Sequence, residues 1–331
     1  MTDNEDITIS RRRALGIAMA GSAVLAAPRI GHAQTADRKL VVLTGTKPPD
    51  PITHLLYYAR EIGAYRKQGL DVEIRELAGE PLALRALLAG QGDIVLSGTP
   101  QALAAMNGGA KIRAISAFFS KPDYVVVGDK SISRMSALSG RTVGVSQVGA
   151  VSQLIPFVMV KQDGGDPRAV RWVPAGGSIN RLQALAAKKL DAVPLNSSFV
   201  PRALGYDHVH VIGDAMQQLP DFLYGVELTT TDTWQQKRAE LLAWTRALSD
   251  AAQWFYSHPD EAVKISQSLL PDVPPAEIDQ GIRAFGTKRF FGTEPDVSRA
   301  KWDFTTKALL DAGAIDRIPD FDQYVVALNK A

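Results

Sequence analysis

Short runs of apolar residues recur along the chain from residue 40 to residue 212, and amphipathic stretches separate them. Several runs are continuous in valine, isoleucine and leucine, which is typical of strands buried on both faces of a parallel sheet. The runs predict strands over residues 40–43, 71–77, 93–96, 112–118, 124–127, 142–145, 170–173, 191–195 and 209–212. The stretches between them predict helices over residues 53–69, 81–89, 100–107, 150–162 and 178–188. This alternation predicts an α/β fold built from right-handed βαβ units.

Two stretches of the chain resemble each other. Residues 72–95 align without gaps on residues 170–193, and the alignment keeps a strand, a glycine loop, a helix and a second strand in phase. The identical pairs are Val72/Val170, Gly79/Gly177, Leu84/Leu182, Ala86/Ala184, Leu87/Leu185, Ala89/Ala187, Asp93/Asp191 and Val95/Val193. The repeat predicts two lobes built on the same βαβ plan, although two similar segments of one sheet would give the same pattern.

From Thr231 to the end of the chain the pattern becomes nearly all helical, with one continuous stretch to about Phe255. Proline and glycine predict breaks at His258-Pro259, between Pro271 and Pro275, and between Gly292 and Pro295. Such helices cannot form a lobe alone, so they must pack on one of the α/β lobes.

The chain is then expected to cross between the lobes near residues 125–129 and 222–229. These crossings predict a first lobe of residues 38–126 and 226–331, which includes the C-terminal helices. The second lobe is predicted over residues 127–225.

The N-terminus has the pattern of an export signal. Residues 1–10 are polar, residues 11–13 are three arginines, and an apolar run covers residues 14–27. Small residues at positions 31 and 33 predict cleavage after Ala33, so that residues 1–33 are removed. The arginine pair favours the twin-arginine type, with a general secretory signal as the alternative. The run is too short to span a bilayer of about 30 Å, but an uncleaved anchor stays a third interpretation.

Composition removes several classes of function. The formal net charge is only +2, so there is no basic field to hold nucleic acid. The chain contains no cysteine, which excludes disulfides, thiolate metal sites, cysteine nucleophiles, Fe–S clusters and lipid attachment behind the signal. We therefore expect a free, soluble protein of the periplasm, and we expect it to be a monomer.

Four small, hydroxyl-rich loops lie between a predicted strand and the helix that follows it. In open α/β sheets, ligands bind at the carboxyl ends of the strands. Glycine lets a ligand approach the backbone, and a helix N-terminus offers free N–H groups to an oxyanion. Each loop alone could also be an ordinary helix cap, but together the loops predict a shared ligand cleft. The candidate ligand-binding residues are Gly45, Thr46, Ser97, Gly98, Thr99, Ser146, Gly149, Ala150, Val151, Ser152, Asn196 and Ser197.

Nothing in the sequence indicates catalysis. The motifs G-x-S-x-G, H-E-x-x-H and G-x-x-x-x-G-K-[ST] are absent. His208 and His210 share one face of a strand without a third ligand, so we interpret them as exposed edge residues rather than a metal site. His54 follows the first loop, where it either contacts ligand or belongs to the first turn of a helix. We expect no metal, no cofactor and no enzymatic activity.

Four segments carry a resemblance to one family. Residues 62–74, IGAYRKQGLDVEI, resemble the G-x-[FY]-x-x-x-G-L-D-V opening of the sulfonate/taurine/nitrate/thiamine-precursor binding proteins, the NMT1/THI5-like and SsuA/TauA-like family. Residues 89–100 resemble the family's A-G-Q-x-D-[IF]…G-x-P, and residues 138–145 resemble its L-x-G-K-[TR]-V-G-V. Residues 190–192 resemble its V-D-A. The four segments follow the order of the family over nearly the whole chain.

The resemblance implies a type II periplasmic binding protein fold, with two lobes, each a mostly parallel sheet flanked by helices, and a double-strand hinge. A small-molecule ligand would lie between the lobes and trigger their closure. The loaded protein would deliver its ligand to an ABC permease and its ATPase in the inner membrane. The family's ligand loops fall here on Gly45 and Thr46, residues 97–99, residues 146–152, and Asn196 with Ser197.

The sequence departs from the family at one ligand loop. Many relatives place Trp-Asp or Trp-Glu where this chain has Asn196-Ser197. An acid there would suit a ligand ammonium, so its absence favours a small organic anion without an amine, such as a sulfonate or carboxylate. A thiamine pyrimidine precursor or a related heterocycle is the alternative. Four aromatic residues are candidates either for an apolar pocket wall or for the core: Tyr57, Tyr58, Tyr124 and Phe199.

Three other functions use similar folds. Enzymes that make the thiamine pyrimidine bring a cysteine cluster, which this chain lacks. The effector domain of a transcription regulator would need a helix-turn-helix where this chain has an export signal. A periplasmic sensor or scavenger that binds ligand without a permease stays open.

Overall fold

The computed structural model describes residues 38–295 and 297–326. Contacts divide the chain into two units, Met1–Ala36 and Asp37–Ala331. The predicted export signal over residues 1–33 lies outside the described residues. All the described sheets and helices belong to the second unit.

The first sheet contains five strands in the order β2-β1-β3-β10-β4. Its strands are β1 (Arg38–Thr44), β2 (Leu70–Glu76), β3 (Ile94–Gly98), β4 (Ile112–Ser116) and β10 (Gly225–Thr230). β1 pairs in parallel with β2 and β3, with Val42 opposite both Ile74 and Ile94. β10 pairs antiparallel with β3 and β4. The sheet is therefore mostly parallel, with one antiparallel strand, as the resemblance implies.

Helices connect the parallel strands of this first lobe. They are the 3-10 helix η1 (Pro51–Thr53), α1 (His54–Glu61), α2 (Ala64–Lys67), α3 (Glu80–Leu88) and α4 (Thr99–Asn107). The single helix predicted over residues 53–69 is divided, because Gly63 adopts a left-handed conformation with φ of 73° between α1 and α2. Pro100 stands in the first turn of α4, where backbone N–H groups form no hydrogen bond within the helix, so the N–H that proline lacks costs nothing there.

The second sheet repeats this plan in the order β7-β6-β8-β5-β9. Its strands are β5 (Val125–Asp129), β6 (Thr142–Val145), β7 (Arg171–Pro174), β8 (Ala192–Leu195) and β9 (Val209–Asp214). β6 pairs in parallel with β7 and β8, whereas β5 pairs antiparallel with β8 and β9. The helices of this second lobe are η2 (Met135–Leu138), α5 (Val151–Gln162), α6 (Ser178–Ala186), η3 (Ser197–Phe199), α7 (Val200–Leu204) and α8 (Ala215–Gln218).

The internal repeat falls on β2–α3–β3 in one sheet and on β7–α6–β8 in the other. Its two aspartates form equivalent hydrogen bonds. Asp93 Oδ2 accepts a hydrogen bond from the Val41 N–H of β1 at 2.9 Å, and Asp191 Oδ2 accepts one from the Thr142 N–H of β6 at 2.7 Å. The two-lobe interpretation is confirmed, since the copies lie in different sheets.

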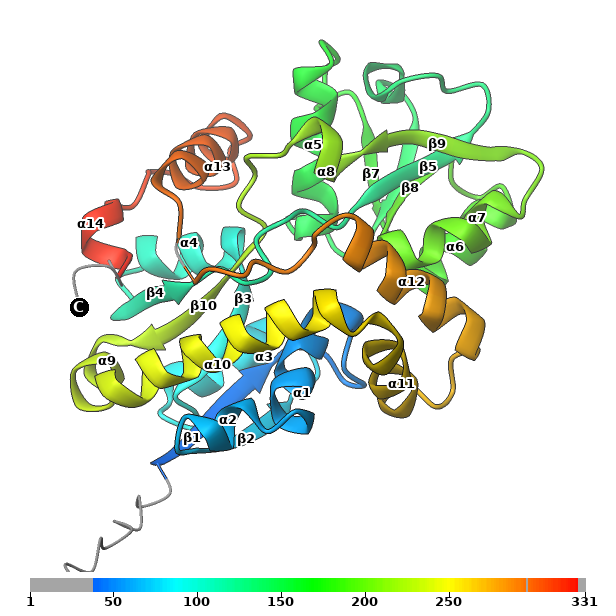
Figure 1. The fold of residues 1–331 in the computed structure, drawn as a ribbon. Coiled ribbons are helices and arrows are strands. Elements are labelled where there is room, and N and C mark those ends of the chain that lie inside the picture. The colour runs from blue at the N-terminus through cyan, green and yellow to red at the C-terminus, as the bar shows by residue number, and fades with distance from the viewer. Residues whose placement is uncertain (1–37, 296, 327–331) are drawn as a thin grey trace, which may run out of the picture. The chain divides into compact units, whose positions relative to one another are not determined.

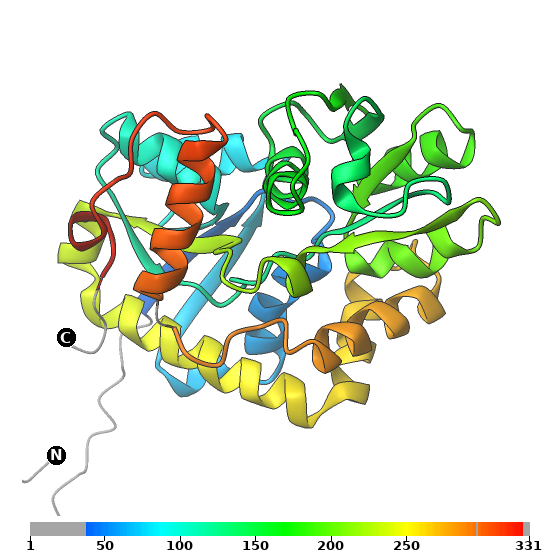
Figure 2. The same cartoon turned by 90° about the horizontal axis from the view of Figure 1, so that it is seen from above.

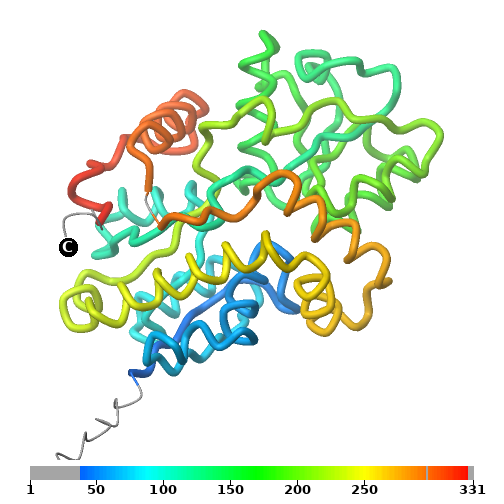
Figure 3. The backbone as a smooth tube through the Cα atoms, in the orientation of Figure 1, coloured from blue at the N-terminus to red at the C-terminus, as the bar shows by residue number. Residues whose placement is uncertain are grey.

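The chain crosses from the first sheet to the second between β4 and β5, and returns between β9 and β10 (Figure 3). The strand β10 was missed by the sequence pattern, which predicts a crossing there but no strand. Its sequence, GVELTT, places a glutamate in the middle, and Glu227 is only 1% exposed. Because a glutamate interrupts the apolar run, the hydrophobic pattern alone does not predict this strand.

Within the described residues, β10 is followed by six helices: α9 (Thr231–Gln236), α10 (Arg238–Ser257), α11 (Pro259–Leu269), α12 (Pro275–Thr287), α13 (Arg299–Asp311) and α14 (Phe321–Tyr324). The predicted continuous stretch to Phe255 is interrupted at Lys237, which separates α9 from α10. α10 packs on α1 and α2, whereas α12 contacts η3 and α13 contacts α5 (Figure 2). These helices therefore contact both lobes instead of one, and the predicted lobe boundaries stay a prediction.

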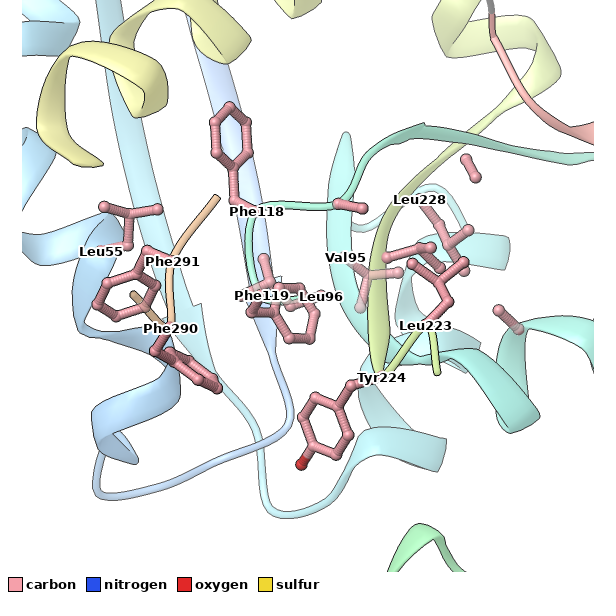
Figure 4. Close-up of a cluster of buried hydrophobic side chains, with 14 of the residues drawn as sticks. Leu55, Val95, Leu96, Phe118, Phe119, Leu223, Tyr224, Leu228, Phe290 and Phe291 are labelled. Carbon is pink, nitrogen blue, oxygen red and sulfur yellow. The ribbon is translucent and has the colours of Figure 1, made fainter. Parts of the chain in front are cut away.

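One large buried cluster joins apolar side chains of the first sheet and the C-terminal helices with those of α5 and part of the second sheet, and Figure 4 shows a portion of it in close-up. Phe118, Phe290 and Phe291 join it with Val95 and Leu228 of the sheet. Phe285 and Phe290 stack with ring centroids 4.2 Å apart. A second, smaller cluster fills the space between the second sheet and α6. Burial of these side chains fixes the two sheets as the frame on which the loops stand.

We predict that Glu227→Gln stabilises the protein at pH 8 and not at pH 5. Both carboxylate oxygens of Glu227 accept the Phe118 N–H at 3.2 Å, and burial raises the pKa of Glu227 to about 7. The folded state therefore binds this proton more tightly than the unfolded chain, so stability falls as pH rises from about 4.5 to about 7. Glutamine keeps an acceptor and removes the charge. The expected gain at pH 8 is about 1–3 kcal/mol.

Thermal unfolding at both pH values measures this effect. Glu61→Gln, at an exposed glutamate of α1, serves as the control and is expected to change the melting temperature little at either pH. An equal change for Glu227→Gln at pH 5 and pH 8 would contradict the argument from burial.

Candidate functional site

The predicted ligand loops lie at the carboxyl ends of parallel strands in both lobes. Gly45 and Thr46 follow β1, and Ser97 and Gly98 end β3 before α4 begins at Thr99. In the second lobe, Ser146 follows β6, the segment from Gly149 to Ser152 leads into α5, and Asn196 and Ser197 follow β8. The topology therefore confirms the strand-end placement on which the prediction was based.

Loops from the two lobes meet at Gly98. A Cβ atom at this position would lie 3.1 Å from Glu80 Oε2 and 3.1 Å from a methyl group of Val151, the first residue of α5. Gly149 adopts a left-handed conformation with φ of 83°, and its N–H donates to Gln153 Oε1 at 2.6 Å. Small residues at the strand ends thus permit a close approach of the lobes.

The backbone donors of these loops already have partners within the protein. The Gly98 N–H donates to Glu80 Oε2 at 3.2 Å, and the Ser197 N–H donates to Asp123 Oδ1 at 3.3 Å and Oδ2 at 3.4 Å. The Ser146 N–H donates to Ser152 Oγ at 2.9 Å. An oxyanion site at these loops requires free N–H groups, and these three are already bonded within the protein.

The first loop is also closed on itself. Thr46 Oγ1 accepts the Asp50 N–H at 3.3 Å, and Asp50 Oδ1 accepts the Ile52 N–H at 3.1 Å as the N-cap of η1. These bonds hold the carboxyl group of Asp50 at the start of η1. Sequence reasoning noted the threonine and missed the aspartate.

Three carboxyl groups belong to this region, those of Asp50, Glu80 and Asp123, and the charge of each acts on Tyr224. Burial raises the pKa of each, and it raises that of Asp123 to about 6. The charge of Asp50 contributes to the rise for Glu80 and Asp123, whereas the bonds from Gly98 and Ser197 lower their pKa values. Asp123 also provides an acid beside Ser197, where the sequence departs from the family. The ligand class inferred from the departure at Asn196 and Ser197 stays a prediction.

A buried arginine holds the second-lobe loops. Arg181 is 2% exposed, and its Nε donates to the Pro194 carbonyl at 2.9 Å. Its terminal nitrogens donate to the Gly176 carbonyl at 2.8 Å and to Ser178 Oγ at 3.0 Å. Ser178 Oγ donates in turn to Asn196 Oδ1 at 3.0 Å. The guanidinium thus fixes the strand end that carries Asn196.

Two tyrosines complete this region. The rings of Tyr124 and Tyr224 lie 6.1 Å apart at an edge-to-face angle of 69°. Burial raises the pKa of Tyr124 to about 12, and it raises that of Tyr224 well above the ordinary value, with Tyr124, Glu80, Asp50 and Asp123 adding to the rise. The three carboxyl groups therefore act on the Tyr224 hydroxyl. Among the described residues, the buried Thr99 Oγ1 and Ser197 Oγ have no hydrogen-bond partner.

A cavity of about 570 Å³ adjoins the first loop. Both lobes and the C-terminal helices line it. Its walls are residues 45–51, Ala78, Gly79, Ile179, Ser198, Phe199, Arg202, Leu270, residues 272–274, Glu277, Ile278, Gly281 and Ile282. Of the predicted site residues only Gly45 and Thr46 line this cavity, and Phe199 is the predicted aromatic that does so. Of the other predicted residues, Val151 adjoins Gly98 and Ser197 adjoins Asp123, whereas Ser146 and Ser152 bond to each other.

The remaining candidates have structural roles. His54 is fully buried, its Nδ1 lies 3.0 Å from Ser266 Oγ, and burial lowers its pKa to about 4. The Tyr57 hydroxyl donates to Glu76 at 2.6 Å, and Tyr58 stacks on Phe255. His208 and His210 each lie close to a backbone carbonyl, of Leu185 and Ile132. Within residues 38–295 and 297–326, no three metal-binding side chains are grouped to hold an ion.

The residues that sequence reasoning missed are Asp50, Glu80, Asp123, Arg181 and Tyr224. Glu80 stands first in its helix, a common place for an acid. The clearest signal is Arg181, because the 3.6-residue period places it on the same face as the buried Leu182 and Leu185. An arginine on an apolar helix face indicates a buried network. No local pattern marks Asp123 or Tyr224.

We predict that Arg181→Met lowers the free energy of unfolding by about 2–5 kcal/mol, because buried carbonyls lose their charged donor. Urea denaturation measures the change. Arg181→Lys keeps the charge with fewer directed donors, and it is expected to fall between Arg181→Met and the native protein. Arg171→Met, at an exposed arginine of β7, is the control. Equal loss in the Arg181→Met and Arg171→Met variants would contradict a structural role for this network.

Comparisons with known proteins agree with this architecture. A family profile described as "NMT1/THI5 like" matches residues 51–262. The chain is 21% identical over 328 residues to "Putative binding protein YtlA" of Bacillus subtilis, covering 94% of this chain and 95% of that protein. In the part of the chain that the structure describes, no helix is both long and apolar enough to cross a membrane.

Two solved structures show the same fold. The periplasmic aliphatic sulphonate binding protein SsuA from Escherichia coli matches with a TM-score of 0.73 at 15% identity, over 88% of this chain and 93% of that chain. The ligand binding component of an ABC-type import system from Staphylococcus aureus, solved with zinc bound, matches with a TM-score of 0.69 at 11% identity, over 88% and 97%. The chain therefore belongs to the NMT1/THI5-like family and has the two-lobed fold of the ligand-binding components of ABC transporters.

Proposed function

We propose that this protein is the solute-binding component of an ABC importer. It is exported to the periplasm, captures a small molecule between its lobes, and delivers that molecule to a permease and its ATPase in the inner membrane. The observation that carries the proposal is that strand-end loops of the two lobes, which the sequence predicts to bind ligand, meet at Gly98 and Val151. Membership of the NMT1/THI5-like family supports it.

Ligand capture follows from the way the two sheets are joined. Two crossings connect them, one before β5 and one before β10. A solute between the lobes contacts both sets of strand-end loops only when the lobes approach each other. Its binding therefore favours the closed arrangement by the free energy of those added contacts. No chemical step is needed for this role, and we propose that the protein is not an enzyme.

The sequence predicts a small organic anion, and the fold shared with SsuA supports that class. A thiamine pyrimidine precursor or a related heterocycle is the second candidate ligand. The contacts at the loop junction favour neither class directly, because the backbone donors there are bonded to carboxylates. A sensor or scavenger that works without a permease remains a second candidate function, since it would use the same cleft.

We predict that one class of small solute raises the melting temperature of the exported protein. A ligand at 100 times its dissociation constant adds about 2.7 kcal/mol of stability. The screen should contain sulfonates, carboxylates, nitrate, aminopyrimidines and amines at matched concentration. Small-angle X-ray scattering with and without the strongest ligand should show a decrease in the radius of gyration as the lobes close.

The transport role needs its own measurement. Uptake of the same solute is expected to be lost when the gene for this protein is deleted, and to return when the gene is restored. Normal uptake by the deletion strain, with binding still seen in vitro, would favour the sensor or scavenger.

A further inference from the structure

We propose that the cleft selects an organic cation, a solute whose protonated nitrogen is held by Asp123, Glu80 and Asp50. The inference rests on the proposed function and names the ligand class of the same site. It replaces the oxyanion that the strand-end loops alone would suggest.

The backbone donors at the loop junction are occupied. Glu80 accepts a hydrogen bond from the Gly98 N–H at the end of β3, and Asp123 accepts one from the Ser197 N–H at the start of η3. The Ser152 hydroxyl accepts one from the Ser146 N–H. The N–H of Thr99 donates to the Tyr224 carbonyl at 2.9 Å. An oxyanion that entered would have to displace the protein's own carboxylates from these donors. Such a ligand would also experience their repulsion.

The carboxylates at the junction retain acceptor capacity. A carboxylate offers about four lone-pair positions. The described residues supply Asp123 with bonds from a single backbone N–H, at 3.3 and 3.4 Å, and Glu80 with one bond at 3.2 Å. Both side chains therefore keep free acceptor positions at the loop junction. Ammonium, amidinium and guanidinium groups carry several N–H donors that fit such positions.

Negative charge exceeds positive charge among the buried groups of this region. The buried cation is Arg181, and three of its five N–H groups go to Pro194, Gly176 and Ser178. The three carboxyl groups thus outnumber it. Burial raises the pKa of all three carboxyl groups, whereas the charge of Lys288 lowers that of Asp123. A ligand cation would add a charged partner for these buried acids. The remaining N–H groups of Arg181 could donate to a carbonyl or hydroxyl of the same solute.

Two hydroxyl groups buried in this region have no hydrogen-bond partner among the described residues, Thr99 Oγ1 and Ser197 Oγ. Tyr224, which is only 5% exposed, adjoins the first of them, since its carbonyl accepts the Thr99 N–H at 2.9 Å. Figure 4 shows the Tyr224 hydroxyl pointing away from the apolar side chains of Leu223 and Leu228. The charges of Glu80, Asp50 and Asp123 act on this hydroxyl. Unpartnered buried hydroxyls beside carboxyl groups indicate a place where a polar ligand group completes the hydrogen bonding.

Isothermal titration calorimetry on the exported protein tests the inference. The probes are propylammonium and propane-1,3-diamine as amines, guanidine and acetamidine as planar cations, and propanesulfonate, nitrate and 4-amino-2-methylpyrimidine as competitors. At least one cation should bind. Asp123→Asn and Glu80→Gln should each weaken that binding by at least about 10-fold, the scale of one charge-assisted hydrogen bond. Asp207→Asn, at an exposed aspartate of the second lobe, should leave the dissociation constant within about 2-fold.

The two groups of cationic probes show whether the cleft prefers an ammonium group or a planar guanidinium or amidinium group. Binding of propanesulfonate, nitrate or the pyrimidine alone, with affinity unchanged or improved in Asp123→Asn, overturns the inference and leaves the solute-binding function standing. A cation that binds equally well to the native protein and to both cleft variants also overturns it. If no probe binds to native protein shown to be folded by circular dichroism, both the inference and the proposed function are contradicted. If either Asp123→Asn or Glu80→Gln fails to fold, the affinity of the other variant still tests the inference.

Discussion

Each sheet is completed by one antiparallel strand that the chain carries in from the other lobe, and the position of the site depends on these two pairings. β10 lies between β3 and β4, and β5 lies between β8 and β9. The crossings are also joined to each other, since the Tyr224 N–H donates to the Ser120 carbonyl at 2.8 Å. Two short connections that end in the interior of two sheets form a hinge, which permits rotation and resists separation.

The same crossings carry the side chains of the cleft. Asp123 and Tyr124 directly precede β5, and Tyr224 directly precedes β10. The backbone of each tyrosine is bonded to the start of a helix, Tyr124 to Ala215 of α8 and Tyr224 to Thr99 of α4. Any rotation about the hinge therefore changes the surroundings of the acid and the two hydroxyls. A solute bound at this point contacts the element that moves.

The sequence predicts the fold well where apolar runs determine it. The strands of both sheets except β10 follow from short apolar runs, several of them continuous in valine, isoleucine and leucine, and the repeat places Asp93 and Asp191 in equivalent positions. The strand-end loops follow from the same pattern. The groups that determine the chemistry do not, because their contacts are distant in sequence. Asp123 reaches a residue 74 positions away, and no local pattern in the chain indicates that pairing.

The carboxylates change what a strand–helix junction can bind. A bare junction presents N–H groups and the positive end of the helix dipole, and so favours an anion. Here the junction instead holds a carboxylate of the protein, Glu80 at Gly98 and Asp123 at Ser197. The N–H groups lower the pKa of these acids against the effect of burial, which helps to keep them ionised. Each junction then presents carboxylate lone pairs to a ligand in place of backbone N–H donors. At such a junction the N–H group positions an acid of the protein, and the cation that we propose as ligand follows from this change of role, while the strand–helix backbone stays the same.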